Sequence, residues 1–135
     1  MNYININEDN IDLLVDFLYR NTNGQKSFRY FKNRKITAIK NHFVTRLFYL
    51  KNKCIGYGHL DKESDFVWLG IMVSDEERGN GYGGIIMENL IESSCNYSVY
   101  LTVDKENKIA YNLYKKCGFL LESENEKYYK MVLKK

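Results

Sequence analysis

A cluster of glycines in the middle of the chain restricts the fold more than any other feature of the sequence. Four glycines lie within six residues, at positions 79, 81, 83 and 84. Glycine allows positive φ angles and lets a ligand approach the backbone amides without obstruction by a Cβ atom. A short polar segment separates the glycines from Phe66–Val73. Phe66–Val73 is apolar on both alternating faces, which predicts a central strand covered on both sides. A buried strand therefore leads into a loop whose shape depends on backbone conformation.

The residues after the glycines predict a helix and then a second strand. Met87, Leu90 and Ile91 recur at helical spacing, and Ser98–Val103 has the composition of a strand. A strand, a helix and a strand in this order form a right-handed parallel crossover unit. The amides at the start of such a helix, together with the helix dipole, suit the binding of a pyrophosphate.

Two pairs of short strands flank this unit and indicate the fold class. Phe43–Leu50 and Cys54–Leu60 are rich in β-branched and aromatic residues and are separated by a polar turn, which predicts an antiparallel hairpin. Phe119–Glu122 and Lys127–Leu133 predict a closing hairpin. We therefore expect the α+β class, with a mostly antiparallel mixed sheet that contains one parallel βαβ crossover and is flanked by helices.

Two further segments have the periodicity of amphipathic helices. In the first, Asn7 is the expected N-cap, and the apolar face consists of Ile11, Leu14, Val15 and Leu18. In the second, Gly118 is at a C-cap position, and the apolar face consists of Ala110, Leu113, Tyr114 and Cys117. Between the first helix and the first hairpin the chain is basic, aromatic and weakly patterned, so we expect a loop with some helix there.

The size and composition of the chain limit the functions that it can have. A chain of 135 residues fits one domain, which we expect to span residues 1–135. The net charge of +3 creates no general polyanion field, so we expect no nucleic acid as a partner. The first residues lack the pattern of a signal peptide, and no apolar stretch reaches the ~18 residues of a membrane span. Three cysteines form neither an even disulfide set nor a paired metal spacing, so we expect a cytoplasmic protein without a metal.

The glycine cluster also matches a second phosphate-binding motif, but the surrounding pattern argues against it. Gly79–Gly84 satisfies the dinucleotide fingerprint G-x-G-x-x-G, and Asp104 follows at the end of the next predicted strand. In that fingerprint the first glycine follows the strand immediately, whereas Ser74–Arg78 intervenes here. The dinucleotide fold also needs more parallel strands than the flanking hairpins supply. A P-loop is excluded because no Gly-Lys-Ser/Thr follows the glycines.

Two motifs in the second half of the chain, at residues 78–83 and 107–119, resemble those of the GNAT superfamily of acyl-CoA-dependent N-acyltransferases. Arg78-Gly79-Asn80-Gly81-Tyr82-Gly83 is similar to its pyrophosphate motif R/Q-x-x-G-x-G/A, with Arg78, Gly81 and Gly83 at the defining positions. Asn107–Phe119 is similar to its segment N-x-x-A-x-x-L-Y-x-x-x-G-F. The two motifs in this order and on these predicted elements are far more specific than either motif alone.

The resemblance implies a single N-acetyltransferase domain that uses acetyl-CoA as its cosubstrate and needs no metal. In this superfamily the strand before the glycine loop separates from its neighbour at a bulge, and its backbone pairs with the pantetheine arm of the cofactor. By position, the cofactor-binding residues would be Ile71, Met72, Val73, Arg78, Gly79, Asn80, Gly81, Tyr82, Gly83 and Asn107. Asn107 could also be a helix cap, and the two roles are compatible.

The resemblance also implies catalytic residues. Tyr114 matches the general-acid tyrosine that protonates the departing thiolate, although it could instead be a core aromatic residue. A backbone amide near Met72 would polarise the carbonyl group. Many relatives carry a glutamate base on the central strand, where this chain has Val67 and Trp68. We expect His59 as the base, since its ordinary pKa near ~6.5 suits proton transfer at neutral pH. The alternatives are a purely structural His59, or a base among Asp61, Glu63 and Asp65.

The acceptor implied by the resemblance is a primary amine of a small molecule. A basic and aromatic segment could hold a phosphate-bearing or nucleotide-linked amino sugar, or it could be a solvated surface. Its residues are Phe28, Arg29, Tyr30, Phe31, Lys32, Arg34 and Lys35. Two other functions stay open, namely acetylation of a protein or peptide amine, and non-catalytic binding of CoA by a regulator. We expect no membrane as a partner, and a homodimer is possible.

Overall fold

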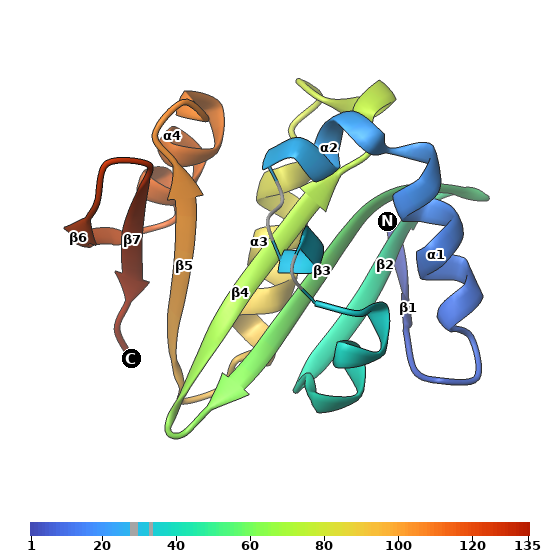
Figure 1. The fold of residues 1–135 in the computed structure, drawn as a ribbon, viewed down its shortest axis with the longest axis horizontal. Coiled ribbons are helices and arrows are strands. Elements are labelled where there is room, and N and C mark those ends of the chain that lie inside the picture. The colour runs from blue at the N-terminus through green and yellow to red at the C-terminus, as the bar shows by residue number, and fades with distance from the viewer. Residues whose placement is uncertain (28–29, 33) are drawn as a thin grey trace.

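A computed structural model describes residues 1–27, 30–32 and 34–135 of the chain. Its centre is a seven-stranded sheet in the order β1-β2-β3-β4-β5-β7-β6 (Figure 1). The strands are β1 (Asn2–Asn5), β2 (Val44–Leu50), β3 (Lys53–Glu63), β4 (Phe66–Val73), β5 (Ser98–Asp104), β6 (Leu120–Glu124) and β7 (Tyr128–Leu133). The α-helices are α1 (Ile11–Arg20), α2 (Thr22–Ser27), α3 (Tyr82–Ser93) and α4 (Lys108–Lys116), and the short 3-10 helices are η1 (Tyr30–Lys32), η2 (Ile36–Asn41) and η3 (Asp75–Glu77).

The order and direction of the strands confirm the expected fold class. β4 and β5 are parallel and are joined through α3, whereas the other neighbouring strands in the described sheet are antiparallel. The first expected hairpin is β2 and β3, and the closing hairpin is β6 and β7, which joins the sheet through β7. The strand expected at residues 66–73 is β4, in the middle of the sheet.

β4 and β5 separate after a short paired region. In the described ladder three residue pairs join them, from Phe66↔Ser98 to Trp68↔Tyr100. β4 stays paired with β3 as far as Val73, without a shift in register. The expected separation of the central strand is therefore present, but the β3–β4 ladder does not contain the expected bulge. Figure 1 shows β4 and β5 diverging toward the end of the sheet where α3 and α4 begin.

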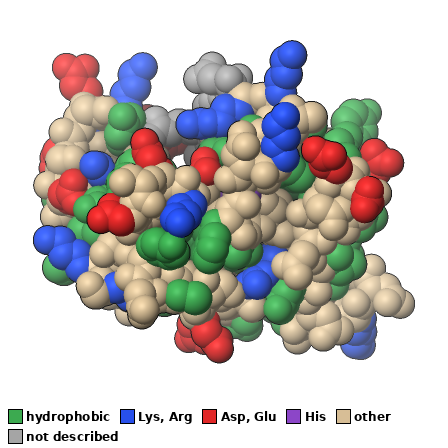
Figure 2. Space-filling view, turned by 90° about the horizontal axis from the view of Figure 1, so that it is seen from below, with side chains coloured by type: hydrophobic (Ala, Val, Ile, Leu, Met, Phe, Trp, Pro, Cys, Tyr) green, Lys and Arg blue, Asp and Glu red, His purple; other side chains and the backbone are tan. Residues whose placement is uncertain are grey.

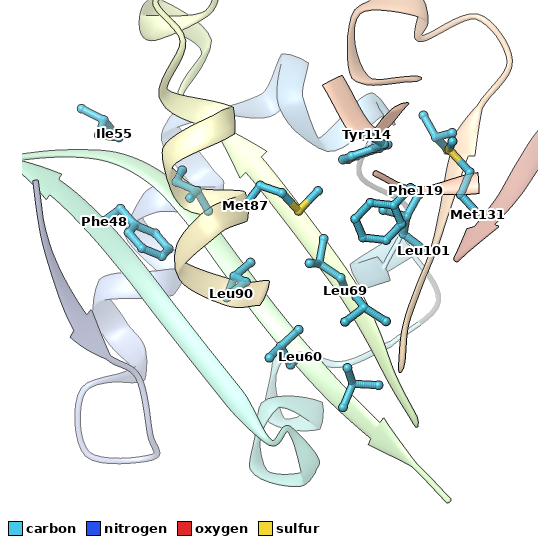
Figure 3. Close-up of a cluster of buried hydrophobic side chains, with 14 residues drawn as sticks. Phe48, Ile55, Leu60, Leu69, Met87, Leu90, Leu101, Tyr114, Phe119 and Met131 are labelled. Carbon is cyan, nitrogen blue, oxygen red and sulfur yellow. The ribbon is translucent and has the colours of Figure 1, made fainter. Parts of the chain in front are cut away.

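The two faces of the sheet carry separate buried clusters. α3 lies behind the sheet in Figure 1, and α1 and α2 lie in front of it. The cluster drawn in Figure 3 includes Leu60 of β3 and Met87 of α3. The cluster on the opposite face includes Tyr57 of β3 and Leu14 of α1. Because side chains alternate along a strand, β3 contributes to both clusters and fixes the helices on both faces.

The first predicted helix is present as α1, but its buried face differs from the expectation. Val15 is 46% exposed, and Phe17 is fully buried in its place. The larger Phe17 side chain removes more apolar area from water, and this decides which stripe of the helix faces the sheet. The expected helix start is also wrong, because the N-cap is Asn10 rather than Asn7.

The sequence pattern does not predict β1. Its four residues, Asn-Tyr-Ile-Asn, do not alternate between apolar and polar types, and all four are exposed. The strand exists because it pairs antiparallel with β2, from Asn2↔Tyr49 to Asn5↔Arg46. Pairing between segments so far apart in the sequence is not visible in a local window.

The surface of the molecule carries charges of both signs. On the face drawn in Figure 2, the basic and acidic side chains that the structure describes are interspersed. This distribution agrees with the small net charge of +3. In the described part of the chain, no helix has the length and apolar composition that crossing a membrane requires.

Candidate active site

A cleft of about 1180 Å³ opens where β4 and β5 separate. β4 lines one wall from Leu69 to Val73, and the end of β5 together with α4 lines the other. The glycine loop and the first residues of α3 line one end, and side chains from β3 and η1 also contribute. The cleft therefore connects the expected cofactor loop with the face of the sheet that the N-terminal helices cover.

Backbone conformation explains two glycines of the loop. Gly79 and Gly81 have φ angles of 87° and 82°, in the left-handed region. A Cβ atom at Gly81 would meet nothing within 4 Å, so backbone strain rather than packing requires glycine there. Gly81 is the N-cap of α3, and no side chain caps this end of the helix. The amides of the first turn therefore lack a side-chain acceptor, which suits the binding of an anion.

Gly83 has a different role, because it lets α3 approach α4 closely. A Cβ atom at Gly83 would lie 3.1 Å from Cδ2 of Leu113 on α4. A larger residue would push the two helices apart. The sequence motifs on α3 and α4 are thus in contact, and Tyr114 directly follows Leu113 on α4.

Most of the expected cofactor-binding residues lie around the cleft. Those that line it are Ile71, Met72, Val73, Arg78, Gly79, Gly81, Tyr82, Gly83 and Asn107. Asn80 does not line the cleft, and its Nδ2 donates a hydrogen bond to Glu77 Oε2 at 3.3 Å. The half-exposed Arg78 side chain lies with Nη2 3.7 Å from Asp75 Oδ1.

Tyr114 lies on α4 and belongs to the buried cluster while it also lines the cleft. It is 8% exposed, and its ring centroid is 6.1 Å from that of Phe119 (Figure 3). Burial raises the pKa of its hydroxyl well above the ordinary value of 10. The hydroxyl therefore keeps its proton throughout the neutral range, so Tyr114 can donate a proton but cannot act as a base there.

Asn107 caps α4, as one of its two expected roles requires. Its Oδ1 accepts a hydrogen bond from Ala110 N at 3.2 Å. The same residue lines the cleft, so a contact with a bound cofactor is compatible with the cap.

His59 lies on β3, opposite Gly70, and is 2% exposed. Its Nδ1 is 2.7 Å from the hydroxyl of Tyr57, and its ring centroid is 4.4 Å from the ring centroids of Tyr30 and His42. Burial, followed by the nearby His42 and Arg34, lowers the pKa of His59 well below 6.5. His59 also lines the cleft, so at neutral pH the site holds an uncharged imidazole.

His42 completes a polar cluster that sequence reasoning missed. Its Nε2 is 2.6 Å from Tyr30 Oη, and its Nδ1 is 2.8 Å from Thr45 Oγ1. Burial lowers its pKa to about 4. No local pattern marks His42, because its partners Tyr30 and Thr45 lie on two other elements, η1 and β2.

The alternative bases differ in their relation to the cleft. Asp61 and Glu63 line it, whereas Asp65 does not. Asp61 Oδ2 accepts a hydrogen bond from Tyr30 Oη at 3.1 Å, and Glu63 Oε2 accepts one from Trp68 Nε1. Among the described residues, no group of three or more His, Cys, Asp or Glu side chains could hold a metal ion.

The basic residues proposed for the acceptor are only partly described. Arg34 lines the cleft, and its guanidinium lies 4.3 Å from the centroid of the Tyr30 ring. Lys35 is exposed and does not line the cleft. Phe28 and Arg29, and the side chain of Lys32, lie outside the described part of the structure.

Comparisons with known proteins agree with this fold. A model of the acetyltransferase (GNAT) family matches residues 9–119. An acetyltransferase of the GNAT family from Streptococcus pneumoniae has a similar structure, with a TM-score of 0.77, 21% identity and 98% of each chain covered. A spermidine N-acetyltransferase from Vibrio cholerae, solved with CoA and spermine, has a TM-score of 0.79 and 16% identity over 98% of this chain and 94% of that one. A putative acetyltransferase from Salmonella typhimurium, solved with acetyl-CoA, has a TM-score of 0.76 and 12% identity over 99% and 93%. No curated protein matches the chain.

Proposed function

This chain belongs to the acetyltransferase (GNAT) family, and we propose that it transfers an acetyl group from acetyl-CoA to a primary amine of a small molecule. The single observation that carries the proposal is the cleft between the separated strands β4 and β5, which reaches the uncapped start of α3. Residues 1–135 form, in this proposal, one N-acetyltransferase domain. Acetyl-CoA supplies the acetyl group as a thioester.

The two ends of the cofactor have matching partners along the cleft. The amides of the first turn of α3, together with Arg78, bind the pyrophosphate, because that helix start has no side-chain cap. The backbone of Ile71–Val73 binds the amide groups of the pantetheine arm, because this part of β4 has no ladder pairs with β5. The side chains of these β4 residues matter less than the edge that their backbone presents.

The chemistry needs one proton donor and one proton acceptor. A C–N bond forms between the amine and the acetyl carbon, and the C–S bond breaks. Tyr114 is protonated at neutral pH and donates its proton to the departing sulfur. His59 accepts the proton that the amine loses, since it is uncharged in the cleft at neutral pH. A backbone amide of β4 near Met72 stabilises the negative charge that develops on the carbonyl oxygen.

Arg34 supports an acceptor that also carries an anionic group, such as a nucleotide-linked amino sugar. Arg34 lines the cleft, where its guanidinium can pair with a phosphate. The Vibrio cholerae protein is described in complex with CoA and spermine, which supports small amines as a class of acceptor for this fold. The identity between the two chains is 16%, so the acceptor itself does not carry over.

A thiol-release assay with acetyl-CoA tests the proposal. The acceptors would be a nucleotide-linked amino sugar, the free amino sugar, spermine and a lysine-containing peptide. We expect at least one of the small amines to cause faster release of CoA than the peptide does. A preference for the peptide would indicate a protein acetyltransferase, and binding of acetyl-CoA without any release would indicate a regulator.

A further inference from the structure

A chain of three hydrogen bonds leads from the protein interior to a carboxylate in the cleft. Thr45 Oγ1 is 2.8 Å from His42 Nδ1, His42 Nε2 is 2.6 Å from Tyr30 Oη, and Tyr30 Oη is 3.1 Å from Asp61 Oδ2. Thr45 is buried, and neither Thr45 nor His42 lines the cleft, whereas Tyr30 and Asp61 do. The chain therefore ends at the surface that an acceptor would touch.

The direction of these hydrogen bonds follows from the chemistry of the four groups. An ionised carboxylate can only accept, so the single proton of the Tyr30 hydroxyl points to Asp61. Tyr30 Oη must then accept from His42 Nε2, which places the single proton of the uncharged imidazole on that nitrogen. His42 Nδ1 in turn accepts from the hydroxyl of Thr45. Every donor points toward Asp61, and the Tyr30 hydroxyl holds its Oδ2.

Asp61 carries a negative charge without a basic side chain beside it. Among the described residues, no Lys or Arg nitrogen lies within 4.0 Å of its oxygens. Arg34 lies over the ring of Tyr30, and Lys62 lies over the ring of Tyr97 at 4.8 Å. A partly buried carboxylate of this kind is stabilised by a cation that enters the cleft.

The position of Asp61 along the sheet is suited to the acceptor rather than to the cofactor. Its partner in the β3–β4 register is Trp68, the last residue of β4 that pairs with β5. Val73, next to the glycine loop, is five residues further along β4, which is about 17 Å in a strand. His59 lies two residues from Asp61 on the same face of β3, so an amine held at Asp61 is near the proposed base.

We propose that Asp61 binds the amino group of the acceptor as a primary ammonium ion, and that Tyr30, His42 and Thr45 position its carboxylate for this. The inference rests on the proposed function, because it assigns the amine-binding residue of the same cleft. The acceptor in this inference carries a positive charge at its amino group, so an alcohol of the same shape should bind less well.

The single tryptophan of the chain provides a direct readout of binding. Trp68 lines the cleft opposite Asp61, so its fluorescence reports occupation of this part of the site. The probes are two matched pairs, butylamine with butanol and glucosamine with glucose. In the wild type we expect the amines to bind about 10-fold to 100-fold more tightly than the alcohols, as for a hydrogen bond to a charged group. Asp61→Asn should remove this preference and leave the binding of the alcohols unchanged.

A matched pair of variants at Thr45, which does not line the cleft, tests the positioning residues. Thr45→Val removes the first donor and keeps the shape, and Thr45→Ser restores the hydroxyl. We expect Thr45→Val to weaken amine binding about 2-fold to 10-fold and to raise KM for the acceptor more than it lowers kcat. Thr45→Ser should recover the wild-type values. Equal effects of the two variants would contradict the positioning role.

The controls separate this inference from the proposed function. Asp65→Asn removes one negative charge outside the cleft and should leave amine binding unchanged. If Asp61→Asn fails to fold, Asp61→Glu keeps the charge on a longer side chain and should bind amines more weakly than the wild type. Wild-type binding without preference for amines, or a preference that survives Asp61→Asn, overturns the inference. If acetyl-CoA also fails to raise the thermal stability of the wild type, the proposed function itself is wrong.

Discussion

At the scale of single residues, Tyr114 lies at the boundary between the buried core and the cleft. Its ring packs against Phe119 in the buried cluster, and the residue also lines the cleft. The two interpretations that the sequence left open are therefore compatible. Burial raises the pKa of the hydroxyl, so the side chain is protonated at neutral pH, as the proton donor of the proposed reaction must be.

Tyr114→Phe removes only the hydroxyl, so folding and acetyl-CoA binding should remain close to wild type. Turnover should fall about 10-fold to 100-fold, at the low end for general acids, because a thiolate leaves fairly well unaided. Steady-state thiol release under conditions where chemistry limits the rate measures this effect. Full turnover in the variant would show that Tyr114 is only a core residue.

The pH profile gives a second measure of Tyr114. Because its pKa lies well above 10 in the folded protein, its ionisation produces no descending limb below pH 10. Wild type and Tyr114→Phe should therefore have parallel profiles at alkaline pH and differ only in height. A descending limb that disappears in the variant would show that the hydroxyl is more exposed to water than its burial indicates.

Two substitutions of Gly81 separate the effect of backbone strain on stability from the effect of a negative charge on acetyl-CoA binding. Gly81→Ala should lower the free energy of unfolding by about 1–2 kcal/mol, because alanine is strained at a φ of 82°. Gly81→Asp suffers less strain, since aspartate tolerates the left-handed region better, but its charge repels a pyrophosphate. We expect acetyl-CoA to raise the melting temperature of Gly81→Ala and not of Gly81→Asp. A wild-type thermal shift in a folded Gly81→Asp would place the pyrophosphate elsewhere.

At the scale of elements, Asp75 ties the short helix α2 to the loop before α3. Its carboxylate accepts hydrogen bonds from Asn23 N at 3.1 Å and from Gly24 N at 2.8 Å. Its own backbone N donates to Asn21 Oδ1 at 2.8 Å. A helix of six residues is not stable alone, so these contacts hold α2 in place. The same carboxylate lies near Arg78, so α2 and the cofactor loop are linked.

Asp75→Ala should loosen α2 without disturbing the sheet. We expect the free energy of unfolding to fall by about 1–3 kcal/mol, because two backbone amides lose a charged acceptor. Hydrogen exchange at residues 22–27 should become faster, as measured by mass spectrometry. Glu76→Ala is the matched control, since Glu76 is largely exposed and pairs only with Lys53 among the described residues. Equal effects of the two substitutions would rule out the link.

The elements that local pattern determines could be predicted from the sequence, and those that distant contacts determine could not. β4 has its expected bounds because its apolar run is continuous, and α3 follows the glycines as expected. β1 depends on pairing with β2, and the exposure of Val15 depends on which side of α1 meets the sheet. Neither of these is encoded in the spacing of a few neighbouring residues.

The candidate site divides in the same way. The glycine loop and Tyr114 belong to contiguous motifs, so their residues could be named from the sequence. The chain from Thr45 to Asp61 joins three separate elements, and its hydrogen bonds depend on the β2–β3 register and on the packing of η1 and η2. A histidine such as His42 has no local signal that distinguishes it from a surface residue.

At the scale of the whole molecule, the cleft depends on both faces of the sheet. β4 and α4 line one part of the cleft, and Tyr30, His59 and Asp61 from the polar cluster under the N-terminal helices line another. That cluster contains both histidines of the chain, which lie with ring centroids 4.4 Å apart. Two imidazoles that must remain uncharged in the folded state make the stability of the entire domain sensitive to acid.

The sign of this sensitivity follows from the two lowered pKa values. His42 has a pKa of about 4 in the folded protein and His59 one well below 6.5, whereas both have 6.5 when unfolded. Between these limits the unfolded chain binds protons that the folded chain does not, so stability is full above pH 6.5 and decreases as the pH falls. Each histidine should cost about 1.4 kcal/mol per pH unit in that range. Urea unfolding between pH 7.5 and 5 should therefore give a slope near 2–3 kcal/mol per unit below pH 6.5, and His42→Gln should about halve it. His59 is the only other histidine, so an unchanged slope in His42→Gln would mean that His42 is not held uncharged in the folded protein.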